Sequence, residues 1–196
     1  MAIRYKLIGN GQPYDVEPGM EISDCGNIAF RRHTRIGPFE QVSHIVISSE
    51  GIRESCWFTV TGDTSKTEYM YPFMHIFDNS MNKWIARDAE GNISQGELTD
   101  DNSFTMKKDI LWTAVYSADM ELAVILVYPE AYSGWPSFKN AWWNRKTDNK
   151  LYFKVNPERQ PGKEFGYEII VQGYNTGEKK WKEEAVKRAD SVIKKF

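Results

Sequence analysis

The sequence has little of what most directly reveals a protein's class. It contains only two cysteines, Cys25 and Cys56, which are too few for a disulfide framework and lack metal-ligand spacing. We expect both to be small buried hydrophobic residues, with a single bridge between them as the alternative. No apolar run reaches the roughly 18 residues that cross a bilayer, because the most hydrophobic stretch, Met120 to Tyr128, has the length of a strand. A membrane is therefore not an expected partner.

An excess of charge of one sign is also absent, since 25 Lys and Arg stand against 27 Asp and Glu. Nucleic-acid binding needs a basic surface that neutralises phosphates, so nucleic acid is not an expected partner either. Phosphate loops, dinucleotide fingerprints and nucleophile elbows are missing, which excludes P-loop, Rossmann and kinase functions. The N-terminus carries no secretory signal. We expect a cytoplasmic protein as the sequence stands, or an extracytoplasmic one if a leader has been removed.

What the sequence does contain is hydrophobic alternation of period two. Three segments between Asn27 and Thr61 predict a meander, with Ile52, Phe58 and Val60 on one face of the third. Further strands are expected at 67–77, 83–88, 109–117, 121–129, 150–156 and 165–174. Eight or nine strands without a long helix between them predict an all-β protein, an antiparallel β-sandwich or barrel.

The C-terminus differs and predicts one amphipathic helix at about 178–196. Trp181, Ala185, Ala189, Val192 and Phe196 recur at helical spacing. The preceding glycine and the lysine-rich end suit a helix start and a favourable dipole end. No linker is long enough to separate domains, so we expect a single domain over residues 1–196.

The three histidines, His33, His44 and His75, are candidate catalytic groups. No pair has metal-ligand spacing, so neither a metal site nor a cofactor is predicted. Each is most simply a hydrogen-bonded or solvent-edge histidine, but three histidines on curved sheets are able to meet on a concave face. Because His44 alternates with Val42 and Val46, we expect it to point toward the core, where its ring nitrogens would need partners.

Residues 31–40 concentrate cationic side chains. On a strand, Arg31 and His33 share one face while Arg32 takes the other, so these cations are placed to bind an acidic ligand such as a uronate. A solvated, charged edge strand is the alternative. The candidate catalytic residues are His44, His75, Arg32 and Arg35.

The stretch 134–150, which we interpret as a loop, concentrates tryptophan. Flat aromatic faces beside amides and guanidinium groups suit sugar rings, which have one C–H-rich face and a rim of hydroxyls. A core plug at one end of the sandwich is an equal alternative. Trp142 and Trp143 are adjacent, so we expect one to be buried and the other available. The candidate substrate-binding residues are Trp135, Asn140, Trp142, Trp143, Asn144 and Arg145.

Three strand-and-turn patterns run from about Asn27 to the end of the chain: GPFEQVSHIVISSEGIRESCWFTVTG, DILWTAVYSADMELAVILVYPEA and NKLYFKVNPERQPGKEFGYEIIVQGY. In these the chain resembles the galactose-mutarotase-like β-sandwich superfamily of sugar epimerases, polysaccharide lyases and bacterial carbohydrate-utilisation proteins. The resemblance implies a supersandwich fold, a carbohydrate-related role and a site on a concave sheet face. The epimerases use histidines and an acidic residue on a late strand. In this chain His33, His44 and His75 fit the role of the histidines, but no acidic residue aligns with the late-strand acid.

These observations predict a protein that binds or processes a saccharide. As an enzyme it would be a lyase or isomerase, in which a His or Tyr abstracts a proton next to a carbonyl or carboxylate and an Arg stabilises the anion. The alternatives are a non-catalytic carbohydrate-binding module and a protein-interaction domain whose aromatic patch meets another chain. The sequence is compatible with two states of assembly, an oligomer of this chain and an accessory domain of a larger enzyme.

Overall fold

The fold comes from a computed structural model, which describes residues 4–15, 26–67, 70–71, 74–100, 110–128, 137–142, 146–156 and 159–195. Within these residues the strands are β1 (Arg4–Gly9), β2 (Gln12–Tyr14), β3 (Asn27–Ile36), β4 (Phe39–Ser48), β5 (Gly51–Val60), β6 (Met74–Ile76), β7 (Lys83–Asp88), β8 (Ile93–Glu97), β9 (Ile110–Ser117), β10 (Leu122–Val127), β11 (Ser137–Trp142), β12 (Lys150–Asn156) and β13 (Glu164–Asn175). The helix α1 spans Trp181–Ile193.

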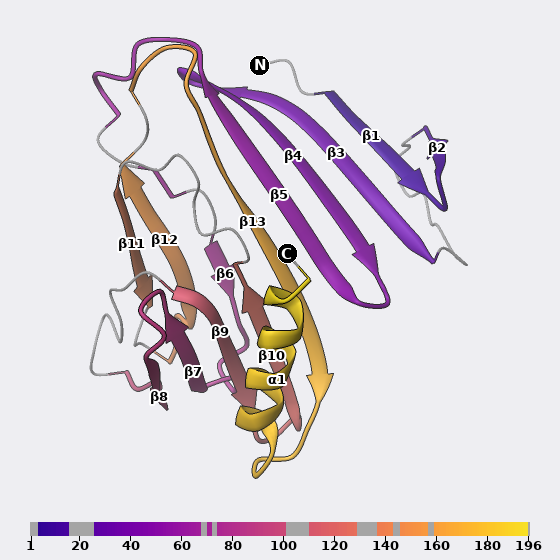
Figure 1. Cartoon of the computed structure of the whole chain (residues 1–196), viewed down its shortest axis with the longest axis vertical. Coiled ribbons are helices and arrows are strands. Elements are labelled where there is room, and N and C mark those ends of the chain that lie inside the picture. Colours follow the sequence, from indigo (N-terminus) through magenta and orange to yellow (C-terminus); the bar gives the residue numbers. More distant parts are fainter. Residues whose placement is uncertain are drawn as a thin grey trace.

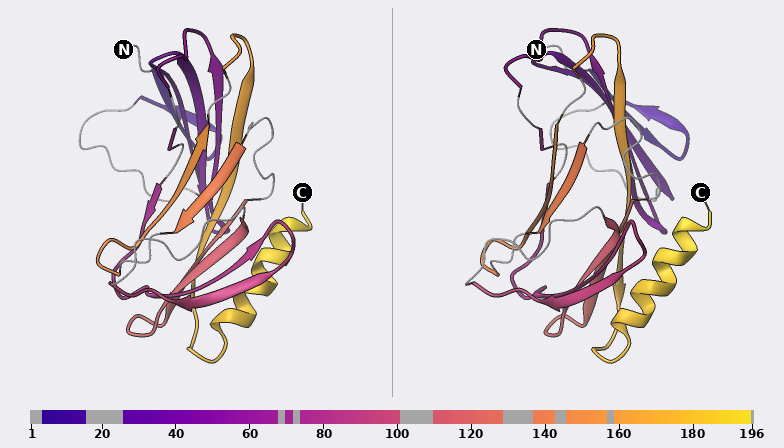
Figure 2. Two further views of the ribbon diagram at one scale, coloured as in Figure 1. Left: turned by 90° about the vertical axis from the view of Figure 1, so that its left-hand side faces the viewer. Right: turned by 60° about the vertical axis from the view of Figure 1, so that its left-hand side comes forward.

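The strands form two antiparallel sheets. The large sheet has ten strands in the order β2-β1-β3-β4-β5-β13-β10-β9-β7-β8, and the small sheet has the order β11-β12-β6 (Figure 1). The small sheet lies against one face of the large sheet and α1 against the other (Figure 2). We call these the inner and the outer face of the large sheet. The predicted all-β antiparallel sandwich with one C-terminal helix is confirmed.

Two apolar layers hold the three parts together. Between the sheets, Phe58 stacks on Phe165 with ring centroids 5.2 Å apart, and Leu151 of the small sheet packs in the same cluster. On the outer face, Trp181 of α1 stacks on Tyr116 of β9, with centroids 5.2 Å apart and planes at 9°. Strands β9 and β10 are buried on both faces, which explains their nearly continuous apolar sequences.

The buried face of α1 is the predicted one, because Trp181, Ala185, Ala189 and Val192 are all buried. The helix is shorter than expected. It begins at Trp181, and no basic residue lies in its last turn, so the predicted lysine-rich dipole end is wrong. Glutamates in the first turn supply the favourable charge at the other end of the dipole.

Other differences concern strands whose sequence pattern is weak. The stretch that we interpreted as a loop contains β11, which pairs with β12 over six residues from Ser137↔Asn156 to Trp142↔Leu151. Within the expected strand at 67–77, the described residues form the three-residue strand β6. The pair β1 and β2 was not expected at all. In each case pairing with a neighbouring strand, rather than local alternation, decides whether the segment is extended.

Candidate functional site

The three histidines do not converge. His33 and His44 are exposed on the outer face, where His33 Nε2 lies 3.7 Å from Glu40 Oε2. His75 belongs to β6 in the small sheet. The expectation that His44 points toward the core is wrong, because the buried side chains of β4 are Phe39, Gln41 and Ser43. Gln41 and Ser43 are polar but lie on the buried face of β4, whereas Val42 and Val46 lie on its outer face. The alternation of apolar residues therefore marks the outer face of this strand.

His75 is the histidine that lies largely buried. It is opposite Leu151 of β12, and its ring centroid lies 6.4 Å from that of Phe77. The adjacent residues Met74 and Ile76 are exposed on the other face of the small sheet. Burial lowers the pKa of His75 to about 4, so the ring is neutral at physiological pH.

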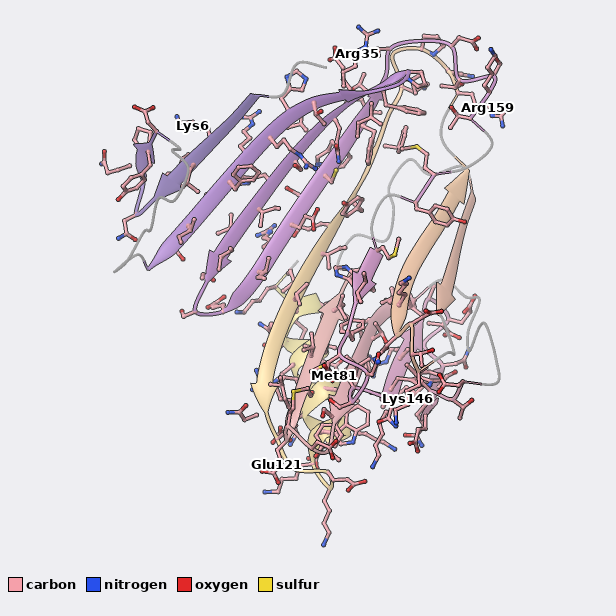
Figure 3. All side chains as sticks on the ribbon, turned by 180° about the vertical axis from the view of Figure 1, so that it is seen from behind. Lys6, Arg35, Met81, Glu121, Lys146 and Arg159 are labelled. Carbon is pink, nitrogen blue, oxygen red and sulfur yellow. The ribbon has the colours of Figure 1, made fainter. Side chains whose placement is uncertain are left out.

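Arg32 and Arg35 lie on opposite faces of β3. Arg35 is paired with Glu40 and, with Arg31 and His33, lies on the outer face; Figure 3 labels it at the end of the strand. Arg32 is paired with Ser43 and lies on the inner face. The predicted division of the cations between the two faces is therefore confirmed, and the structure does not bring Arg32 and Arg35 together.

The tryptophan-rich stretch is only partly described. Asn140 and Trp142 lie in β11, opposite Phe153 and Leu151. Their side chains, and the whole of Trp135, Trp143, Asn144 and Arg145, lie outside the described residues. The roles predicted for these six residues stay predictions.

The described part of the inner face carries a set of polar residues that no sequence pattern had grouped into one site. Pairing of β3, β4, β5 and β13 places Arg32, Ser43, Cys56 and Tyr167 opposite one another in a single row across four strands. Gln41 and Glu54 occupy the rows on either side. We call these six residues the inner-face polar cluster; its members are Arg32, Gln41, Ser43, Glu54, Cys56 and Tyr167.

Hydrogen bonds link four members of the cluster. Gln41 Nε2 donates to Cys56 Sγ at 3.0 Å, and Tyr167 Oη donates to Glu54 Oε1 at 3.1 Å. Gln41 and Ser43 are 6% and 1% exposed, yet Gln41 Oε1 and Ser43 Oγ have no hydrogen-bond partner among the described residues. Buried polar atoms are nearly always satisfied in folded proteins. Because both atoms are closed off from solvent, a buried water molecule is the partner that suits them.

The charge states in the cluster favour binding over covalent chemistry. Burial raises the pKa of the Cys56 thiol to about 11, although hydrogen bonds from Gln41 and Tyr167 and the charge of Arg32 oppose this rise. Burial, helped by Cys56 and Glu54, also raises the pKa of Tyr167. Both groups stay neutral at physiological pH. The cluster thus contains a guanidinium as a donor, and a carboxylate, an amide oxygen and a serine hydroxyl as acceptors.

A sequence signal for this cluster existed. Strand alternation from Ile52 to Val60 includes Glu54 between two apolar residues of the same face. A carboxylate inside an apolar row costs free energy unless it has a partner there. The partner, Tyr167, comes from a distant strand and is set by tertiary pairing.

In the described part of the chain, no group of three or more His, Cys, Asp and Glu side chains is placed to hold a metal ion. No helix of those residues has both the length and the apolar character of a bilayer span.

No family model matches the sequence, and no curated protein matches it. Solved structures do share its fold. The α-N-acetylgalactosaminidase NagBb from Bifidobacterium bifidum, as a quadruple mutant, matches 99% of this chain and 30% of its own, with a TM-score of 0.56 and 9% identity. The GH36 α-galactosidase AgaA from Geobacillus stearothermophilus matches 90% of this chain and 28% of its own, with a TM-score of 0.50 and 12% identity.

A putative aldose 1-epimerase from Escherichia coli K12 also matches, over 86% of this chain and 78% of its own, at a TM-score of 0.37 and 8% identity. The matches with the two glycosidases show a shared fold. The chain spans less than a third of the length of the two glycosidases.

Proposed function

We propose that the chain is a saccharide-binding β-sandwich domain whose ligand lies against the inner-face polar cluster. The observation that carries this proposal is the exposed guanidinium of Arg32 close to the half-buried carboxylate of Glu54, above the buried polar groups of Gln41 and Ser43. Sugar hydroxyls both donate and accept hydrogen bonds, so one ring is able to satisfy both kinds of charged group.

The fold supports a carbohydrate context. The structures that share it with TM-scores of 0.50 and above include proteins named as an α-galactosidase and an α-N-acetylgalactosaminidase. Because this chain matches less than a third of those proteins, the role of an accessory domain in a larger carbohydrate-active assembly is part of the proposal.

We propose binding rather than turnover. The histidine mechanism needs His44 and His75 in one site, whereas His44 lies on the outer face of the large sheet and His75 in the small sheet. Tyr167 is held neutral and already donates its proton to Glu54 in a hydrogen bond, so it is a poor base at physiological pH.

The test is calorimetric titration of the full chain with galactose, N-acetylgalactosamine, raffinose and a trimer of galacturonic acid. Arg32→Gln removes the exposed cation of the cluster and is expected to weaken binding about 10-fold, the free energy of one hydrogen bond to a ligand. Lys6→Gln, which removes an exposed cation of β1, is the matched control and is expected to bind like the wild type. Equal affinity of the Arg32→Gln variant and the wild type for every sugar that binds, or no binding of any of them, would contradict the proposal.

A further inference from the structure

Trp57 is an exposed tryptophan in the middle of a strand. It lies on β5 between Cys56 and Phe58, both of which point inward, so its own side chain points to the outer face. The residue is 42% exposed. The outer face also carries α1, but the helix packs on β9 and β10 and not on β5 (Figure 1).

Gly166, directly opposite Trp57 on β13, determines how the indole lies. A Cβ atom added to Gly166 would lie 2.5 Å from Cε3 and 2.6 Å from Cδ2 of Trp57. The ring therefore extends across the gap between the strands and occupies the space above the glycine. A glycine inside a strand often marks such a close approach. The indole is consequently held against the sheet, and binding a ligand on its exposed side costs little side-chain entropy.

Polar side chains surround the ring on most sides. Along β5 its neighbours on the outer face are Ser55 and Thr59, and directly opposite on β4 is Val42. The diagonal positions on β4 and β13 are Glu40, His44, Glu164 and Glu168. Thr59 Oγ1 donates to Glu164 Oε1 at 3.3 Å, and Arg53 Nε lies 2.8 Å from Glu168 Oε1. We call Trp57, Gly166 and the rim of Ser55, Thr59, Glu164 and Glu168 the Trp57 platform.

We propose that the Trp57 platform binds the apolar face of a neutral pyranose ring, as a saccharide contact separate from the inner-face polar cluster. One aromatic face has the size of one sugar ring, and carboxylates and hydroxyls at its edge accept hydrogen bonds from sugar hydroxyls. The nearby glutamates are balanced by cations on the same face, with Arg53 Nε 2.8 Å from Glu168 Oε1 and Arg35 opposite Glu40, so the surface has no positive excess to attract an acidic sugar. The binding surface faces away from the inner face, so this inference stands independently of the proposed function.

A protein partner fits this surface less well. A stable protein interface buries about 800 Å² on each partner around an apolar centre of several residues. Around Trp57, the only other apolar side chain among its strand neighbours is the half-buried Val42. A single ring within a polar rim matches the dimensions of a sugar and not those of a protein contact.

The test follows the indole N–H resonance of Trp57 in the full chain during titration with cellohexaose, galactotriose and a trimer of galacturonic acid. We expect at least one neutral oligosaccharide to shift this resonance and the acidic trimer to leave it unmoved. Trp57→Ala, followed by calorimetry, is expected to lower the affinity for that oligosaccharide about 10-fold or more.

Two controls separate the platform from other sites. Tyr71→Ala removes another exposed aromatic residue, which is 48% exposed, and is expected to leave binding unchanged. Arg32→Gln removes the exposed cation of the inner-face polar cluster and is expected to leave the Trp57 shift intact. The inference is overturned if no neutral oligosaccharide moves the Trp57 resonance, if Trp57→Ala retains full affinity, or if the acidic trimer binds more tightly. A change of oligomeric state in Trp57→Ala, with sugar binding intact, would identify a protein contact instead and also overturn it.

Discussion

The amide nitrogen of Gln41 donates a hydrogen bond to the sulfur of Cys56, with Nε2 and Sγ 3.0 Å apart on the inner face of the large sheet. The thiol is fully buried, and its pKa is raised to about 11 by that burial. Cys56 is thus a neutral acceptor inside a polar cluster. It packs as a structural group with little capacity for nucleophilic chemistry.

We expect Cys56 to resist alkylation in the folded protein. At pH 8 the shift of its pKa alone lowers the thiolate fraction about 100-fold relative to an ordinary thiol, and burial lowers access further. Iodoacetamide labelling followed by peptide mass spectrometry measures the rate at this residue alone, with the urea-unfolded chain as the control. Labelling of native Cys56 as fast as in the unfolded chain would contradict its assignment as a buried neutral thiol.

Two glycines of β13 offer a matched comparison. In Gly166→Ala the new methyl group would lie 2.5 Å from both the ring of Trp57 and the carbonyl oxygen of Cys56, and we expect a loss of about 1–3 kcal/mol in the free energy of unfolding. In Gly173→Ala nothing lies within 4 Å, and we expect no loss, or a gain of about 0.5 kcal/mol from lower chain entropy. Urea denaturation measures both. Equal stabilities of the two variants would show that the indole does not rest on Gly166.

The buried ring of His75 makes stability depend on pH. Its folded pKa of about 4 lies below the ordinary value of 6.5, so the folded state binds a proton less readily than the unfolded chain. The contribution of neutral His75 to the free energy of unfolding is therefore complete above pH 6.5 and is lost as the pH falls toward 4. We expect a loss of about 2 kcal/mol at pH 5 relative to pH 7 from this residue.

The measurement is urea unfolding of the wild type and of His75→Gln at both pH values. The substitution is expected to reduce the difference between them, because the titrating group is gone. His44→Gln provides the matched control, since His44 is exposed on the outer face. An unchanged difference in His75→Gln would argue against a buried neutral ring.

Local sequence patterns were enough to predict the longer strands and the helix. Alternation predicted the meander of β3, β4 and β5 and the bounds of β7 and β12. Helical spacing predicted the buried face of α1. These features depend on side-chain direction within one segment, which follows from backbone geometry.

Alternation was less reliable for deciding which face is buried. In β4 the apolar residues Val42 and Val46 lie on the outer face, while Gln41 and Ser43 are buried. The buried amide group has a partner in Cys56 of the neighbouring strand, which lowers the cost of its burial. For this reason the expectation that His44 points toward the core is wrong.

By itself the sequence determined the class of the fold, most of its strands and the amphipathic helix, because each of these is specified by the periodicity of a short segment. Only the tertiary structure decided which residues share a site. Arg32, Ser43, Cys56 and Tyr167 form one row because four strands pair in a particular register. Trp57 likewise rests on a glycine that is distant in sequence. Register depends on packing across the whole sheet, and no single segment contains that information.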